Sequence, residues 1–341
     1  MRDKYIVAFP HPPAFGGPGS FQYRAEKFIK SIGWKVVYAS DRTQPDAIFV
    51  VGGTKRIRWL WKMKKKNVPI IHRLDGINWL HKKVKVSLET WIIDEGRNRL
   101  IQLIKYLFAD LIVYQSKYVE KIWLEYDMYS KKKYEIIPNG IDLSVFQPIT
   151  RDAKISLLCV EGHLDYSPFA IELINKLQEA LIEKSEFESI ICYGKFNDQK
   201  NRQKLHPSII FKGLVPREQI PLIFKNAIYL SLDINAACPN TVIEALGCGI
   251  PVIGFNTGAL SELVKNDSGI IVDYGSDPHQ LAFPKLESLV EAAHKINSNW
   301  QYYSNNARQL AQEKFDIEKI MEQYLELITH QIKKSKSLVQ N

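Results

Sequence analysis

The chain has 341 residues, of which 45% are hydrophobic and 24% charged, and its formal net charge is +9. Because this length exceeds the size at which one hydrophobic core usually stops growing, the sequence predicts two domains. It contains no run of about 18 to 20 apolar residues, as a membrane-spanning helix would need, and it begins without a secretory signal pattern. We therefore expect a cytoplasmic protein.

Short β-branched or aromatic runs alternate with longer amphipathic segments along the first half of the chain, at residues 5–10, 34–40, 46–53, 68–74, 111–116 and 134–140. The alternation then starts again, with runs at residues 154–162, 189–196, 208–215, 227–234, 251–256 and 269–275. This pattern is typical of parallel sheets covered by helices. Pro138, Gly140 and Pro148 punctuate the segment between the two sets, which we interpret as an interdomain linker.

The glycines after the first predicted strand suggest a loop that approaches an anion. In the segment PHPPAFGGPGSFQ, Gly16, Gly17 and Gly19 precede a predicted helix, whose N-terminal amides favour negative charge. Their spacing is GGxG rather than the GxGxxG of dinucleotide-binding loops. A plain tight turn explains this loop equally well.

The segment at residues 238–272 is the most informative part of the sequence. It predicts a helix that opens at Asn240 or Thr241 beside a strand end, with Glu244 about one turn into that helix. A carboxylate at this position can accept hydrogen bonds from the diol of a ribose. The alternative is that Glu244 only complements the helix dipole.

This segment, CPNTVIEALGCGIPVIGFNTGALSELVKNDSGIIV, closely resembles the donor-site signature of retaining glycosyltransferase family 4, the glycosyl transferases group 1. Further motifs match the family in the correct order, namely QSKYV, IIPNGID, CYGKFN, FKGLVPREQIPLIFKNA and FDIEKIMEQYLEL. The resemblance covers nearly the whole chain, and several motifs in order are more specific than any single one.

The resemblance implies an α/β fold of the GT-B type, with two Rossmann-like, doubly wound domains that face a central cleft. Residues 1–147 would form the acceptor-side domain and residues 148–312 the nucleotide-sugar donor domain, and a helix at residues 313–335 would cross back to the first domain. It also implies a retaining glycosyltransferase of the hexosyltransferase type. Such an enzyme moves a sugar from a nucleotide sugar to a glycan or lipid-linked acceptor, here in surface polysaccharide or glycolipid biosynthesis.

The resemblance also assigns roles to residues of the donor site. Glu244 would grip the ribose of the donor, and the backbone amides of the loop and helix start would hold the sugar and the diphosphate. The other positions that it implies are Asn240, Thr241 and Val242 at the helix start, Leu214 and Val215 in the base pocket, and Gly16 and Gly17 facing the phosphates. Family members need no bound metal, and the sequence has no DxD motif. We therefore expect no metal and no other cofactor.

The sequence departs from the family at three donor-site positions. Ala236 stands where the family has a second glutamate, and His163 and Pro168 stand where an arginine and a lysine neutralise the diphosphate. His163, protonated beside a diphosphate, and Lys195 on a neighbouring strand end are candidate replacements. A surface histidine and a solvated lysine are the alternatives.

A third group of polar residues follows a predicted strand of the first half. Asp75 stands where the family usually has a histidine, and His72 and Arg73 precede it. Because open α/β sheets bind ligands at the carboxyl ends of their strands, we predict an acceptor-side site here, with Asp75 as a base or as a hydrogen-bond acceptor for a sugar hydroxyl. The alternative is that Asp75 caps the turn before Ile77. Asp75 and Glu244 are thus the catalytic candidates.

The departures from the family leave a second function open. A catalytically silent scaffold that binds nucleotide sugar and partners a related active enzyme would tolerate Ala236, His163 and Pro168. The positive charge lies in residues 1–150, which hold 26 basic and 14 acidic residues. Without a nucleic-acid motif, we expect no nucleic-acid partner.

Two basic segments of the first half also carry tryptophans. Residues 54–66 and 78–91 interleave ten lysines and arginines with Trp59, Trp61, Trp79 and Trp91. This pattern favours a peripheral position on the anionic inner face of the membrane. The lysines that we expect to contact the membrane are Lys64, Lys65, Lys66, Lys82 and Lys83. The alternative is a solvated basic face whose tryptophans pack inward.

Overall fold

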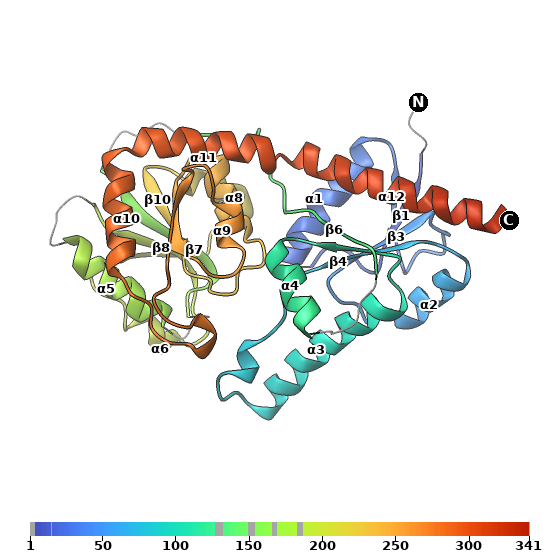
Figure 1. The fold of residues 1–341 in the computed structure, drawn as a ribbon, viewed down its shortest axis with the longest axis horizontal. Coiled ribbons are helices and arrows are strands. Elements are labelled where there is room, and N and C mark those ends of the chain that lie inside the picture. The colour runs from blue at the N-terminus through green and yellow to red at the C-terminus, as the bar shows by residue number, and fades with distance from the viewer. Residues whose placement is uncertain are drawn as a thin grey trace. The chain divides into compact units, whose positions relative to one another are not determined.

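The protein comprises two compact units (Figure 1). The computed structural model describes residues 4–14, 16–126, 132–148, 154–165, 169–182 and 187–340. Unit 1 consists of Met1–Gly140 together with Ile317–Asn341, and unit 2 is Ile141–Asp316.

Unit 1 is built on a six-stranded sheet with the order β2-β1-β3-β4-β5-β6, in which all neighbouring strands are parallel. The strands are β1 (Ile6–Phe9), β2 (Lys35–Tyr38), β3 (Ala47–Val51), β4 (Ile70–Leu74), β5 (Leu111–Tyr114) and β6 (Tyr134–Ile136). The helices are α1 (Gly17–Ser31), α2 (Ile57–Lys65), η1 (Leu80–Lys82), α3 (Leu88–Leu107), α4 (Lys117–Tyr126) and α12 (Ile317–Gln340).

Helices cover both faces of this sheet. Because successive side chains of a strand point to opposite faces, the side chains of each strand are buried on both sides. Phe49 of β3 packs with α1 and α12 on one face, whereas its neighbour Ile48 packs with Leu60 of α2 and Ile104 of α3 on the other. The strands therefore consist almost entirely of apolar residues rather than of an alternating pattern.

Helix α12 completes the core of unit 1 although it comes from the end of the chain. The ring of Tyr324 is 2% exposed and lies 5.2 Å from the ring of Phe21 and 5.3 Å from that of Phe49, measured between centroids. Ile320, Met321 and Ile328 extend the same buried face. The helix continues to Gln340, beyond the end at residue 335 expected from the sequence.

Unit 2 is built on a second six-stranded parallel sheet, with the order β12-β11-β10-β7-β8-β9. The strands are β7 (Ser156–His163), β8 (Ile190–Lys195), β9 (Ile210–Gly213), β10 (Ala227–Ser231), β11 (Val252–Phe255) and β12 (Gly269–Val272). The helices are α5 (Ala170–Ile182), α6 (Gln199–Arg202), η2 (Arg217–Gln219), α7 (Ile220–Ile223), α8 (Asn240–Gly247), α9 (Leu260–Leu263), η3 (Pro278–Gln280), α10 (Glu287–Ser298) and α11 (Trp300–Lys314). This strand order is that of dinucleotide-binding Rossmann folds.

The division between the units falls earlier than the position expected from the sequence. Ile141 is fully buried in unit 2, where its amide donates to the carbonyl of Phe315 at 2.8 Å. Arg308 donates to the carbonyls of Phe146 at 2.6 Å and Gly247 at 2.5 Å. These bonds hold residues 141–148, which the sequence predicts as part of the interdomain linker, against α8 and α11.

Among the described residues, no helix combines the length and the apolar character needed to cross a bilayer.

The packing of α12 generates a prediction about stability. Replacing Tyr324 by alanine should lower the free energy of unfolding by about 3 to 5 kcal/mol, because a buried aromatic ring between Phe21 and Phe49 leaves a cavity. Tyr106→Ala is the matched control, because Tyr106 is 55% exposed. Urea unfolding followed by circular dichroism measures both. Equal losses for the two variants would contradict the packing described here.

Candidate functional site

The strand order of unit 2 creates a topological switch point between β7 and β10, from which the sheet is extended in opposite directions. Ligands of open α/β sheets bind outside the carboxyl ends of the strands at such a point. His163 ends β7 and Ser231 ends β10. The predicted donor residues Asn240, Thr241 and Val242 come next along the chain after β10, at the start of α8.

Helix α8 presents its N-terminus near this sheet edge. It begins at Asn240 behind Pro239, and no side chain caps it. The amides of Asn240, Thr241 and Val242 belong to the first turn, where a helix offers its N–H groups no carbonyl partner of its own. The hydroxyl of Thr241 accepts a hydrogen bond of 2.8 Å from the hydroxyl of Tyr229 in β10, which fixes the helix start to the sheet.

Glu244 lies on the buried side of α8, with 5% of its surface exposed. Burial, reinforced by the Glu244 carboxylate, raises the pKa of Cys248 to about 12. The sequence therefore places a carboxylate inside the unit, one turn beyond the start of α8. The carboxylate is thus enclosed by the protein and not solvated at the surface.

Two loops at this edge hold each other in place. The amide of Ala259 donates to the carbonyl of Ala236 at 2.7 Å. Gly258 has a φ of +57°, and a Cβ there would meet the amide nitrogen of Ala236 at 2.6 Å. The loop that carries Ala236, where the family has a glutamate, is thus clamped to the loop after β11.

His163 and Lys195 are direct partners in the pairing of β7 with β8. Nδ1 of His163 is buried and has no hydrogen-bond partner among the residues that the structure describes, while Lys195 is exposed. Both candidate replacements for the missing cations therefore lie at neighbouring strand ends. Pro168, the other departure from the family, lies outside the described residues.

Leu214 and Val215 lie farther from the switch point than the other predicted donor residues. They follow β9, an edge strand that β8 separates from β7. Leu214 is 65% exposed and Val215 is partly exposed. Unit 2 does not by itself enclose them in a base pocket.

Two carboxyl groups at the switch point were not identified from the sequence. Burial, together with the nearby Asp233 carboxylate, raises the pKa of Glu161 to about 8. Burial also raises the pKa of Asp233, although that carboxylate accepts a bond of 2.8 Å from the amide of Asn235. Glu161 lies near the end of β7 and Asp233 follows β10. Their positions at the ends of adjacent strands were the feature of the sequence from which they could have been found.

Gly16 and Gly17 lie in unit 1, directly before α1, and both are exposed. Gly16 precedes the first helical residue with a φ of +94°, a conformation that favours glycine. No side chain caps α1, so its first amides face the loop. This geometry is compatible with an approaching phosphate and equally with a tight turn.

Asp75 follows β4 of unit 1 and is the centre of a hydrogen-bond network. Its Oδ1 accepts bonds from Arg73 at 2.7 Å and from Gln115 at 2.5 Å. Gln115 also accepts a 3.4 Å bond from Asn139, whose side chain in turn accepts a short bond from Arg73. Asp75 is itself a partly exposed side chain, and burial raises its pKa despite the opposing Arg73 charge.

The second oxygen of Asp75 points toward Gly52, where a Cβ would lie only 2.7 Å from Oδ2. Gly52 has a φ of +65°, so both its conformation and the available space require glycine. The indole of Trp123 donates to the backbone carbonyl of Asp75 at 2.7 Å. Asp75 is thereby held by Arg73 of its own strand, by the residues that follow β3 and β5, and by α4. Gln115, Asn139 and Trp123 were not identified from the sequence, although Gln115 and Asn139 follow neighbouring strands.

The two residues before Asp75 are buried rather than open to a ligand. Arg73 stacks on the ring of Phe21, with its guanidinium carbon 3.8 Å from the ring centroid. His72 points to the opposite face of the strand, where its Nε2 lies 2.7 Å from the carbonyl oxygen of Gly52. Burial and nearby Lys105 lower the pKa of His72 to about 4, against the effect of that hydrogen bond. Arg73 thus contacts Asp75 directly, whereas His72 contacts the backbone of Gly52.

Three of the lysines that the sequence assigned to a membrane surface contact the protein. Lys64 pairs with Asp110, Lys66 donates to the side chain of Gln44 at 3.1 Å, and Lys65 lies over the ring of Trp61 at 3.7 Å. The positive charge of Lys64 is therefore balanced by Asp110, and the ammonium groups of Lys65 and Lys66 are engaged by neighbouring side chains.

Among the described residues, no three histidine, cysteine, aspartate or glutamate side chains gather into a group able to hold a metal ion.

Comparison with known families concerns unit 2. Residues 169–309 match the family model described as glycosyl transferases group 1. A probable sucrose-phosphate synthase from Thermosipho melanesiensis is 26% identical over 217 residues, which are 58% of this chain and 48% of that protein. A putative glycosyltransferase from Bacillus subtilis, YtcC, is 21% identical over 254 residues, with 65% and 59% covered. The chain spans about half the length of these curated relatives.

Solved structures match the fold over nearly the whole chain. A sucrose-phosphate synthase from Thermosynechococcus elongatus has a TM-score of 0.72 at 16% identity, covering 96% of this chain and 99% of that one. HepE from Anabaena in complex with UDP-glucose has a TM-score of 0.67 at 15% identity, covering 95% and 99%. The chain itself has two Rossmann-like units, each built on a parallel sheet. Together with these matches, they confirm the predicted α/β fold class of the GT-B type.

The raised pKa of Glu161 generates a prediction about stability and pH. The folded protein keeps a proton on Glu161 up to a pKa of about 8, whereas the ordinary value is 4.5. Stability from this group is therefore complete below pH 4.5 and is lost as the pH rises through about 8. Glu161→Gln should abolish this loss, so that the variant gains several kcal/mol relative to wild type above pH 8, at about 1.4 kcal/mol per pKa unit.

Thermal unfolding at several pH values measures this effect. Asp233→Asn should move the loss to lower pH, because the neighbouring negative charge that helps to raise the pKa of Glu161 is removed and burial alone remains. The midpoint of the loss in this variant therefore separates the effect of charge from that of burial. Glu179→Gln, at an exposed position of α5, is the control. An identical pH profile for Glu161→Gln and wild type would refute the assignment.

Proposed function

We propose that the protein is a glycosyltransferase that moves a sugar from a nucleotide-sugar donor to a glycan or lipid-linked acceptor, with retention of anomeric configuration. The observation that carries the proposal is the position of Glu244 in α8, beside the switch point of a Rossmann-like sheet and within the segment that matches the family model. The family resemblance of the sequence supports retention and surface polysaccharide or glycolipid assembly as the pathway.

The donor would lie at the carboxyl edge of the unit 2 sheet. Glu244 would accept hydrogen bonds from the ribose, and the first amides of α8 would receive the diphosphate, where the helix dipole favours negative charge. UDP-glucose is the first donor to test, since HepE was solved with it.

The charge of the leaving diphosphate must be balanced by groups at this edge. Lys195 and a protonated His163 would supply positive charge in place of the family's arginine and lysine. Glu161 would remain protonated at neutral pH because its pKa is raised to about 8, and so would not repel the diphosphate. Lys195 and His163 would thus stabilise the negative charge of the leaving diphosphate, and a neutral Glu161 would not oppose it.

On the acceptor side, Asp75 would accept a hydrogen bond from the attacking hydroxyl or remove its proton. The oxygen of that hydroxyl forms a bond to the anomeric carbon of the donor while the bond from that carbon to the diphosphate breaks. In the front-face displacement that retention requires here, the leaving phosphate helps to take the hydroxyl proton. His72 and Arg73 would act through Asp75 rather than on the sugar.

A catalytically silent nucleotide-sugar-binding scaffold is the second candidate. It is favoured by Ala236, which supplies no carboxylate for the transferred sugar, and by the missing arginine and lysine. Turnover of a panel of nucleotide sugars distinguishes the two, because a scaffold binds donor without releasing nucleotide.

We also place the protein in the cytoplasm at the inner face of the membrane, where a lipid-linked acceptor would be reached. The basic first half of the chain supports this position, because anionic lipids of the cytoplasmic leaflet attract clustered lysines.

The donor assignment predicts the effect of Glu244→Ala. The variant should bind nucleotide sugar more weakly by roughly 1.5 to 3 kcal/mol, because the ribose loses hydrogen bonds to a charged group. Isothermal titration calorimetry with UDP-, GDP- and ADP-sugars measures the change. Glu291→Ala, at an exposed position of α10, is the control. An unchanged affinity of Glu244→Ala would remove Glu244 from the donor site.

The acceptor assignment predicts a different effect for Asp75→Asn. This isosteric change should lower kcat by about 100-fold or more, since a positioned general base contributes at least that factor, while donor affinity stays at the wild-type value. Steady-state turnover and the same calorimetry separate the two quantities. Full activity of Asp75→Asn would leave the capping of the following turn as the role of this residue.

We further propose that catalysis needs no metal ion or other cofactor, because the sequence lacks a DxD motif to hold a divalent ion against the diphosphate. Activity should survive treatment with EDTA. Loss of turnover that manganese or magnesium restores would contradict this proposal.

A further inference from the structure

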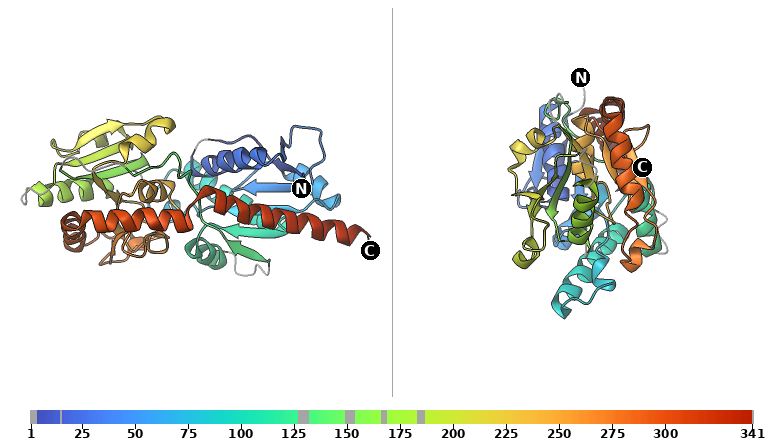
Figure 2. Two further views of the ribbon diagram at one scale, coloured as in Figure 1. Left: turned by 90° about the horizontal axis from the view of Figure 1, so that it is seen from above. Right: turned by 90° about the vertical axis from the view of Figure 1, so that its left-hand side faces the viewer.

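Helix α3 is too long for the sheet that it covers. Its 20 residues span about 30 Å, whereas the five residues of the preceding strand β4 span about 17 Å. The start of α3 therefore extends beyond the sheet, as both figures show (Figures 1 and 2). Because α3 follows β4, this end lies at the carboxyl edge of the sheet, the edge that carries Asp75.

The projecting end is apolar. Leu88, Trp91, Ile92 and Ile93 occupy four of the first six positions of α3, and each is between 43% and 74% exposed. Among large apolar side chains, exposure of this degree at four neighbouring positions is unusual for a surface helix, whose apolar residues normally face the core. We name these four residues the α3 tip.

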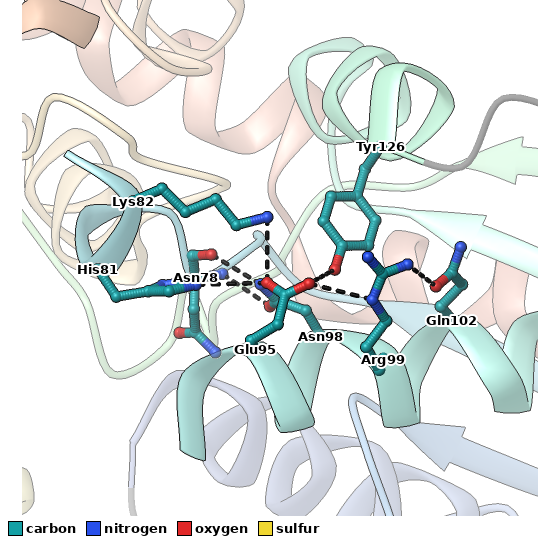
Figure 3. A network of polar contacts seen from close by, with 8 residues as sticks. All are labelled: Asn78, His81, Lys82, Glu95, Asn98, Arg99, Gln102 and Tyr126. Carbon is teal, nitrogen blue, oxygen red and sulfur yellow. Dashed lines mark hydrogen bonds and ion pairs between the residues drawn. The ribbon is translucent and has the colours of Figure 1, made fainter. Parts of the chain in front are cut away.

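A polar network holds the tip in a defined shape (Figure 3). The side-chain amide of Asn98 donates to the carbonyl of Asn78 at 2.7 Å and its oxygen accepts from the amide of Asn78 at 3.0 Å. These two bonds fix the segment before the tip to α3. The ring of His81 also packs edge-on against Trp91, with 5.9 Å between centroids.

Glu95 is the centre of this network. It accepts hydrogen bonds from Tyr126 at 2.7 Å and from Arg99 at 3.0 Å, and it pairs with Lys82 at 3.0 Å. Burial opposes ionisation of Glu95, but the bonds from Tyr126, Lys82 and His81 and the charge of Lys82 outweigh it and lower the pKa of Glu95 to about 2. The network remains ionised at neutral pH, so the tip is presented on a rigid base rather than on a flexible loop.

The lysines beside the tip differ in how much of their charge is free. Lys82 is paired with Glu95, whereas Lys83 and Lys85 are exposed next to the apolar side chains. Between residues 79 and 93 the chain carries three lysines and a single acidic residue, Glu89. An apolar surface bordered by positive charge is complementary to a bilayer with anionic headgroups, where apolar side chains enter the interface and lysines meet phosphate.

We propose that the α3 tip, with Lys83 and Lys85, is the element that docks unit 1 onto an anionic lipid bilayer. This inference rests on the proposed function and deepens it, because docking at this end of α3 brings the edge that carries Asp75 toward a lipid-linked acceptor. It keeps Lys83 and Trp91 from the basic segments that the sequence predicted at the membrane, and it replaces Lys64, Lys65, Lys66 and Lys82 of that prediction by the apolar start of α3 and Lys85.

A second copy of the chain is a poorer occupant of this surface. A symmetric contact between two tips would bring the same lysines together, and like charges at an interface oppose association. Four side chains at the end of one helix also bury far less than the roughly 800 Å² per partner of a stable interface.

Co-sedimentation of the full chain with vesicles tests the proposal. Wild type should bind phosphatidylcholine vesicles that contain phosphatidylglycerol and should not bind pure phosphatidylcholine vesicles. Replacing Leu88, Ile92 and Ile93 by glutamine, which favours helix, should weaken binding by at least about tenfold through loss of apolar burial. Replacing Lys83 and Lys85 by glutamine should weaken it by about thirtyfold and reduce its sensitivity to salt.

The other end of the same helix supplies a matched control. Leu103, Tyr106 and Leu107 are 41% to 55% exposed, and their triple replacement by glutamine should leave vesicle binding unchanged. An equal loss in this control would overturn the proposal, because α3 would then lie flat on the membrane. Wild-type binding by the Leu88, Ile92 and Ile93 variant would also overturn it, as would oligomers of wild type that this variant abolishes.

Insertion can be observed directly, because all four native cysteines are buried. A polarity-sensitive probe on Ile92→Cys should shift to the blue with anionic vesicles, whereas one on Leu222→Cys, at an exposed position of unit 2, should not. No shift at Ile92 would refute insertion. Donor affinity and vesicle binding of the wild type, measured side by side, separate the two proposals. Normal donor binding without vesicle binding sinks only the docking, and vesicle binding without donor binding sinks only the glycosyltransferase.

Discussion

The constraint on which the rest of the structure depends is that both sheets are entirely parallel. Every strand must then be followed by a crossover that returns to the opposite edge, so all carboxyl ends of a sheet meet at one edge. Residues far apart in sequence, such as Asp75, Gln115 and Asn139, are neighbours for this reason. In unit 2 the strand order also reverses between β7 and β10, the position at which open α/β sheets bind their ligands.

Polar groups at these edges are buried only where the surrounding structure satisfies them. Asp75 is held by Arg73 and Gln115, and Arg73 is itself held by Asn139 and by the ring of Phe21. An arginine buried without such partners would cost several kcal/mol. The network therefore fixes the direction of one carboxylate oxygen and leaves the other beside Gly52, the kind of preorganisation that a base for a sugar hydroxyl requires.

The same physical balance separates charges that are available to a partner from those that are not. Lys64 is tied to Asp110 and Lys82 to Glu95, whereas Lys83 and Lys85 remain exposed. A count of lysines treats all four alike. Only the pairing decides which of them contribute to attraction at a distance, since a paired charge is largely neutralised before a partner arrives.

The sequence by itself determined the two α/β units, because buried parallel strands must be apolar on both faces and so appear as short continuous runs. It also predicted that a helix begins near Asn240 with Glu244 one turn further on, and that Asp75 follows a strand, because these positions depend on local spacing. Only the tertiary structure decided that Ile141 belongs to unit 2, that His72 and Arg73 are buried, and that Glu161 and Asp233 are neighbours. These outcomes depend on packing between segments that lie far apart in the chain, and no local pattern encodes the partner that a side chain will meet.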